Sequence, residues 1–200
     1  LVKVPHVSHL RLTTHLCTAF IIISYLTWVA MTELWPATQR GFTRGTPTWV
    51  RRFSLILPFL LLVQVAYGGL NAGLKTGYTF VTFPKMFNHW IPPQVFGGEG
   101  FFHSLIFDVF TVHFIHRTYA WLLFLGIIVF WWYGKKALMP LKRPHHIRAL
   151  HLLLIAVSGQ FILGVGTVLT QTQIHTALAH QVWGVVLFLS SINLIQQLRR

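Results

Sequence analysis

The chain has 200 residues, of which 54% are hydrophobic and only 10% are charged. A soluble domain usually carries roughly 25% charged residues, so the composition argues against a soluble globular fold. The formal net charge of +13 does not indicate a nucleic-acid-binding protein, because the basic residues lie between apolar segments rather than along one face. The single cysteine, Cys17, excludes an internal disulfide.

Five apolar segments follow one another along the chain. A helix that crosses a bilayer needs about 20 mostly apolar residues, and each segment meets that length. The fold class predicted is therefore all-α, a polytopic membrane bundle of about five transmembrane helices. The expected spans are residues 10–31, 53–74, 109–133, 147–169 and 175–198.

The basic residues orient these spans. If the spans alternate in direction, most of the positive charge falls on one side, which should be the cytoplasm or the mitochondrial matrix. The first, third and fifth spans then run inward. The basic-side residues are Arg40, Arg44, Arg51, Arg52, Lys135, Lys136, Lys142, Arg143, Arg148, Arg199 and Arg200, whereas the other side has Lys3, Arg11, Lys75 and Lys85.

The long outer segment, residues 75–108, is rich in Phe, Gly, Pro and Trp. Such a composition favours a cap on the membrane interface, and a disordered loop is the alternative. Lys75 and Lys85 border this cap, where they could contact haem propionates or lipid headgroups.

A two-helix pattern occurs twice in the chain. In the second and fourth spans, Gln64 and Gln160 are each followed four residues later by a glycine, Gly68 and Gly164. Gly69 and Gly166 lie close by, and such glycines let helices approach closely. We expect a site at the repeat interface, with the two glutamines bonding between helices. The third and fifth spans match as well, with His116-Arg117 before 123–125 and His180-Gln181 before 187–189.

Three histidines are placed at matched depth in the inward-running spans. His15, His116 and His180 each lie five to eight residues into a span, roughly 8–12 Å below its outer end. A small residue follows each of them one turn deeper on the same helix face. A flat porphyrin needs such a bare turn, although small residues also serve helix packing in lipid. The small residues are Ala19, Ala120 and Gly184.

Histidine inside a membrane is costly and indicates a functional site. Neutral imidazole is a good axial ligand for haem iron, and two imidazoles fill both axial positions, which favours electron transfer over oxygen binding. A zinc site would need three or four close ligands, often with a carboxylate. Glu33, Glu99 and Asp108 are not placed for that, so we predict a b-type haem between histidines.

Several polar residues near these histidines have weaker assignments. Arg117 could pair with a haem propionate, with Asp108 or with a backbone carbonyl. His113 could reach a propionate, but a wet interfacial position is the favoured interpretation. His175 is expected in a loop or at the interface. On the basic side, a solvated cluster is expected for His145, His146 and His151.

Six segments carry a resemblance to a known family: 11–16 (RLTTHL), 68–74 (GGLNAGL), 82–86 (TFPKM), 90–92 (WIP), 116–117 (HR) and 180–181 (HQ). Together they resemble the haem A synthase family, in its mitochondrial and proteobacterial branch, over nearly the whole chain. The glycine-asparagine segment and the proline-lysine-methionine after it are the specific part. The paired histidines alone would be a weaker signal.

The resemblance implies two similar four-helix halves in the family. Residues 1–52 would hold the last helix of the N-terminal half and a basic loop, and 53–200 the C-terminal half with haem b. His116 and His180 match the axial pair, and Arg117, Ala120 and Gly184 would line the cofactor. His15 matches an axial histidine of the other half, whose partner would lie upstream. The chain, which starts at Leu1, is therefore expected to be a processed product or a fragment.

The family oxidises a methyl group of haem O to the formyl group of haem A, which cytochrome oxidase requires. Its N-terminal half has a glutamate three residues before the first histidine, but His113 stands at the matching position here, so no catalytic residue is assigned. The expected function is the haem b part of such an oxidoreductase. The alternatives are a b-type cytochrome electron carrier and a transporter or packing subunit without haem.

The resemblance also implies partners and a location. The expected partners are membrane lipid, haem O as substrate, a ferredoxin-like protein or a quinone for electron transfer, a second copy of the chain and haem O synthase. The expected location is the mitochondrial inner membrane, with the bacterial plasma membrane as the alternative.

Overall fold

The computed structural model describes residues 8–34 and 41–200, and this part of the chain is helical apart from turns, loops and one isolated bridge. Five of its helices are long and apolar enough to cross a membrane, which confirms the polytopic helical fold. Lys3 and Arg40 lie outside the described residues. The helices are α1 (His9–Leu34), α2 (Thr48–Leu74), α3 (Phe101–Phe107), α4 (Val109–Leu138), α5 (Pro144–Leu169) and α6 (Ile174–Gln197), with short 3₁₀ turns η1 (Thr76–Tyr78) and η2 (Met139–Leu141).

Local signals set the helix ends. Helix α2 ends where Lys75 adopts a left-handed conformation (φ 56°) and its N–H bonds back to the last turn. Helix α4 begins after Asp108, whose carboxylate accepts a hydrogen bond of 3.0 Å from the N–H of Phe110. Helix α5 begins at Pro144, whose missing N–H is not needed in a first turn.

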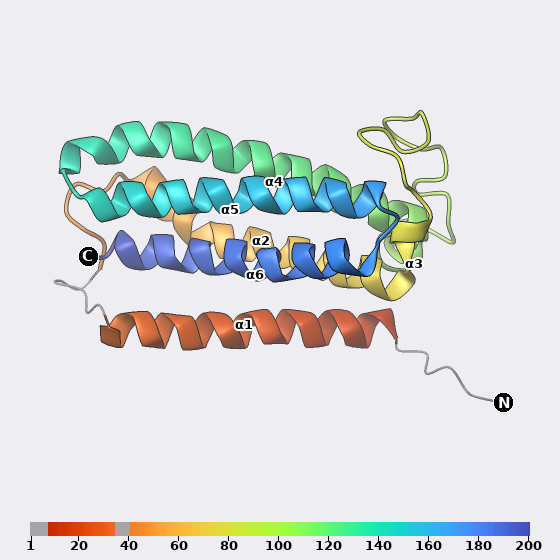
Figure 1. Cartoon of the computed structure of the whole chain (residues 1–200), viewed down its shortest axis with the longest axis horizontal. Coiled ribbons are helices and arrows are strands. Elements are labelled where there is room, and N and C mark those ends of the chain that lie inside the picture. The colour runs from red at the N-terminus through yellow and green to blue at the C-terminus, as the bar shows by residue number, and fades with distance from the viewer. Residues whose placement is uncertain (1–7, 35–40) are drawn as a thin grey trace.

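Four helices, α2, α4, α5 and α6, form a bundle, and α1 lies along one side of it (Figure 1). Helix α2 packs against α4 and α6, and α5 packs against the same two helices, so α4 and α6 lie diagonally across the bundle. Large apolar side chains such as Phe59 (74% exposed) and Ile162 (68% exposed) point outward, as expected of a lipid-facing surface. The buried core includes Leu57, Leu61, Ile127, Phe130, Leu150, Leu153, Leu187 and Phe188.

The connections place the basic residues at one end of the bundle. Residues 41–47 before α2, the α4–α5 turn and the C-terminus gather there, whereas the cap and the α5–α6 link lie at the opposite end (Figure 1). This arrangement agrees with the predicted orientation, in which the basic end faces the cytoplasm or the matrix.

The segment 75–108 is a folded cap rather than a disordered loop. Phe80 is fully buried and packs against Phe110 and His113 of α4, with ring centroids 5.2 and 5.4 Å away. The N–H of Phe96 donates to the hydroxyl of Thr111 at 2.9 Å. These contacts fix the cap on the outer end of α4. Helix α3 within the cap was not predicted from the sequence.

Candidate functional site

One histidine from each of two diagonal helices contacts a neighbouring helix of the bundle. His116 lies on α4 and His180 on α6, both are half-buried, and they are near enough to interact electrostatically. In each ring the Nδ1 atom is buried, and the described part of the chain offers it no hydrogen-bond partner. Each ring therefore has an unused nitrogen, and the pairing of the two rings as ligands of one iron stays a prediction.

A glutamine from each of the other two helices contacts these rings. The amide nitrogen of Gln64, on α2, lies 3.4 Å from Nε2 of His116 and also donates to the backbone carbonyl of His116 at 3.1 Å. The amide nitrogen of Gln160, on α5, lies 3.4 Å from Nε2 of His180. The predicted interhelical bonding of both glutamines is confirmed. That their partners are the two site histidines was not predicted from the sequence, although the repeated glutamine–glycine spacing was a signal of a shared role.

Glycines four residues after the glutamines bring the helix backbone close to the same rings. A Cβ atom on Gly68 would lie 3.4 Å from Cε1 of His116, and one on Gly164 would lie 3.0 Å from Cε1 of His180. Residues four apart share a helix face, so each intervening helix presents an amide and a bare turn to one imidazole. Gly184, expected to clear space for a cofactor, faces the Gln160 amide, which would lie 3.3 Å from its Cβ.

The donor set fits a haem better than a bare metal ion. In residues 8–34 and 41–200, no three His, Cys, Asp or Glu side chains are grouped closely enough to hold a metal ion, which argues against a zinc site there. Two imidazoles on diagonal helices, each with a buried nitrogen lacking a partner, match the axial requirement of a six-coordinate haem iron. The neighbouring turns at Gly68 and Gly164 carry no side chain that would obstruct the rings.

Arg117 connects the cap to α4 beside His116. Its Nη2 donates to the backbone carbonyls of Thr82 at 2.9 Å and Pro84 at 3.2 Å, and its guanidinium lies 5.6 Å from the ring centre of Phe83. The predicted partners of Arg117 were a haem propionate, Asp108 and a backbone carbonyl, and the structure shows backbone carbonyls. Asp108 instead caps α4. The Nη1 atom of Arg117 is buried without a partner among the described residues, so it could still contact an anion.

The predicted wet position of His113 is wrong. Its side chain is only 4% exposed, and its Nδ1 lies 3.2 Å from the carbonyl oxygen of Thr76. The reason is the cap, because Phe80 and the η1 turn cover the outer end of α4 where open interface was expected.

His145, His146 and His151 were predicted to form a solvated cluster on the basic side, and this prediction is wrong for His146. His146 is fully buried in the first turn of α5, with its ring centre 4.6 Å from that of His145. His151 lies one turn deeper, 5.9 Å from the ring of Trp131 on α4. Helix α5 packs against both α4 and α6, which buries His146, whereas His145 and His151 remain half-buried. His175 is exposed, as expected.

His15 does not join the central set. It is exposed on α1, as is Ala19 one turn later. Helix α1 contacts the bundle through a different face, where Thr13 lies against Gly69 and His9 lies against Gly73. A second haem at His15 therefore stays a prediction.

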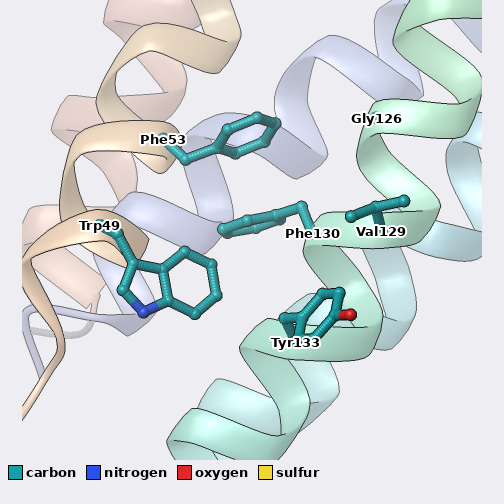
Figure 2. Close-up of a pocket in the computed structure, with 6 residues that line it drawn as sticks. All are labelled: Trp49, Phe53, Gly126, Val129, Phe130 and Tyr133. Carbon is teal, nitrogen blue, oxygen red and sulfur yellow. The ribbon is translucent and has the colours of Figure 1, made fainter.

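A separate crevice of about 430 Å³ opens between α2 and α4 (Figure 2). Its lining is aromatic and aliphatic, so it suits hydrocarbon and supplies no histidine ligand. It lies nearer the basic end than the His116–His180 pair and is not the candidate site. The lining residues are Trp49, Phe53, Gly126, Val129, Phe130 and Tyr133.

Comparison with known proteins adds independent information. The family model described as COX15-CtaA, cytochrome oxidase assembly protein, matches residues 1–192. Proteins named heme A synthase are similar: that of Nitrosospira multiformis is 36% identical over 200 residues, covering 100% of this chain and 55% of the relative. That of Paramagnetospirillum magneticum is 37% identical over 190 residues, covering 94% of this chain and 51% of the relative.

The chain thus spans about half the length of these relatives. No solved structure matches it. The match to the family model covers almost every residue, including all five apolar helices, up to Ile192. The chain therefore belongs to the COX15-CtaA family of cytochrome oxidase assembly proteins.

Proposed function

We propose that this chain is the haem b-holding part of a haem A synthase, which oxidises the methyl group of haem O to the formyl group of haem A. The relatives named heme A synthase support the haem A role. The observation that supports the haem b assignment is the position of His116 and His180 on the diagonal helices α4 and α6, each beside a glycine backbone.

In this proposal His116 and His180 are the axial ligands. A bound haem would supply an iron centre that takes up and releases single electrons. The protein residues orient the two imidazoles and exclude water. The cap covers the outer end of α4 with Phe80, and the Nη1 of Arg117 offers a positive charge beside His116 for a carboxylate. With His15, exposed on α1, a second haem would lie outside the four-helix bundle.

A b-type cytochrome that only carries electrons is the second candidate. It requires nothing beyond the His116–His180 pair, and the histidine at position 113 instead of a glutamate favours it. The relatives are bacterial, which supports the bacterial plasma membrane as the location, with the basic end in the cytoplasm. The mitochondrial inner membrane is the alternative.

Complementation separates the two candidates. Cells that lack haem A synthase would receive the full gene product that contains this chain, and their haems would be extracted and identified. Haem A in the cells, and haem b with haem O or haem A in the purified protein, would support the synthase. Full haem b occupancy without haem A formation would contradict it and favour the carrier.

A further inference from the structure

We propose that the crevice between α2 and α4 is a binding site for an anionic phospholipid from the leaflet at the basic end of the bundle. One acyl chain would lie in the crevice, and the phosphate would meet Arg52 and Lys136 just beyond it. This inference is independent of the haem proposal, because the crevice lining contains no histidine.

Aromatic side chains of two helices form the walls of the crevice. Trp49 and Phe53, one turn apart, line it from α2, and their rings contact Phe130 of α4, with ring centres 6.0 and 4.2 Å away (Figure 2). The crevice opens outward, since Trp49 and Val129 in its lining are 44% and 54% exposed. Its volume of about 430 Å³ falls within the range of small-molecule sites, roughly 300–1,000 Å³.

The wall of the crevice carries no side chain at Gly126. A Cβ atom on this glycine would meet nothing within 4 Å, so the space beside the α4 backbone is open. A hydrocarbon chain in such a groove is contacted on more sides than a chain on a convex helix surface. Dispersion attraction is small for each atom pair and adds up over many contacts, so the groove favours one ordered chain.

The crevice ends at the level where lipid headgroups are expected. Trp49 is the second residue of α2, and Tyr133 lies five residues before the end of α4 at Leu138. Both of these helix ends lie at the basic end of the bundle (Figure 1). Trp and Tyr are enriched at the membrane–water interface. A lipid with its chain in the crevice would therefore place its phosphate next to Trp49 and Tyr133.

Two exposed cations flank this end of the crevice. Arg52 follows Trp49 by three residues on α2, and Lys136 follows Tyr133 by three residues on α4. Residues three apart are neighbours on a helix surface. The Nζ of Lys136 lies 4.8 Å from the ring centre of Trp132, a cation–π contact that involves none of the other lining residues. An ammonium group has three N–H donors, so it can still bind a phosphate oxygen.

Protein carboxylates do not neutralise these two cations. Within residues 8–34 and 41–200, the one ion pair joins His103 to Glu99 at 4.0 Å, in the cap at the opposite end. Arg52 and Lys136 therefore have no carboxylate partner in that part of the chain. Basic pockets between transmembrane helices on the cytoplasmic or matrix side bind anionic headgroups. Charge complementarity thus favours an anionic phospholipid over a neutral lipid.

The test compares phosphatidylglycerol with phosphatidylcholine of the same acyl chains. The purified full gene product is titrated with each lipid in detergent, and native mass spectrometry gives the affinity of the tightest-bound lipid and the oligomeric state. Gly126→Leu fills the crevice, and Gly166→Leu on α5 is its control, because a Cβ there also meets nothing within 4 Å. Arg52→Gln and Lys136→Gln each remove one charge, and Arg148→Gln, at an exposed position on α5, is their control.

We expect the parent protein to bind phosphatidylglycerol more tightly than phosphatidylcholine. A cation near an anionic lipid surface contributes about 1 kcal/mol, so Arg52→Gln and Lys136→Gln should each bind phosphatidylglycerol about fivefold more weakly. Their affinity for phosphatidylcholine should equal that of the parent. Gly126→Leu should lose tight binding of both lipids, and the two control variants should match the parent.

Equal affinity of the parent for the two lipids, or parental phosphatidylglycerol binding in Gly126→Leu, would overturn the inference. A parent dimer that Gly126→Leu converts to a monomer would also overturn it, because a second copy of the chain would then occupy the crevice. If Gly126→Leu does not fold, the two charge variants decide the outcome, and parental phosphatidylglycerol affinity in both would contradict the site.

Discussion

The ring of His180 lies against the backbone of Gly164 so closely that a Cβ atom there would come within 3.0 Å of Cε1. The equivalent Cβ on Gly68 would lie 3.4 Å from Cε1 of His116, an ordinary van der Waals contact. The contact between His180 and Gly164 is therefore tighter than the equivalent contact between His116 and Gly68.

This difference predicts unequal effects of the same substitution. Gly164→Ala should displace the His180 ring by a few tenths of an ångström and accelerate haem loss, whereas Gly68→Ala should leave it nearly unchanged. Visible spectra and haem dissociation rates of the two purified variants provide the measurement. Equal rates, or a larger effect at position 68, would contradict the tight contact.

Arg117 is predicted to hold the cap. Its two hydrogen bonds to the carbonyls of Thr82 and Pro84 both come from Nη2 at the end of a long side chain, which the shorter Gln side chain does not reproduce, so Arg117→Gln should loosen residues 80–90. Hydrogen bonds from charged groups contribute about 1.5–3 kcal/mol, a loss that should appear as faster amide hydrogen exchange in the cap. Arg148→Gln, at an exposed position on α5, is the control. Unchanged exchange in Arg117→Gln would exclude this role.

Helix α1 is predicted to depend on two glycines of α2. A Cβ on Gly69 would lie 2.9 Å from the Cα of Thr13, and a Cβ on Gly73 would overlap the backbone of His9. Backbone atoms cannot rotate away, so Gly69→Ala and Gly73→Ala should separate α1 from α2. Engineered-cysteine crosslinking between the helices should fall, while haem binding by the four-helix bundle persists. Gly126→Ala is the control, because its Cβ would enter open space. Crosslinking equal to that of the control would refute the prediction.

Much of the fold followed from hydropathy, because a bilayer requires long apolar helices whatever their partners. The third span was predicted to end near 133, yet α4 continues to Leu138 because Lys135 and Lys136 favour helix and end it with basic charge. The predicted interhelical bonding of both glutamines is confirmed, and the role of His116 and His180 stays a prediction.

Contacts made by the cap and by neighbouring helices could not be predicted in the same way. His113 is buried because Phe80 and Thr76 reach it from a loop, and nothing local to His113 indicates that. His146 is buried because α5 begins inside a tightly packed corner. The glutamine–imidazole contacts depend on which helices are neighbours, information that spacing along one helix does not contain.

The most direct test of the central claim is the electron paramagnetic resonance spectrum of the purified full gene product and of its His116→Ala, His180→Ala and His175→Ala variants. The account predicts a low-spin haem b signal with two imidazole ligands in the parent and in the exposed-site control His175→Ala. The same signal should be absent from both His116→Ala and His180→Ala. An unchanged low-spin signal in either of those two variants would contradict the assignment of this pair as the haem ligands.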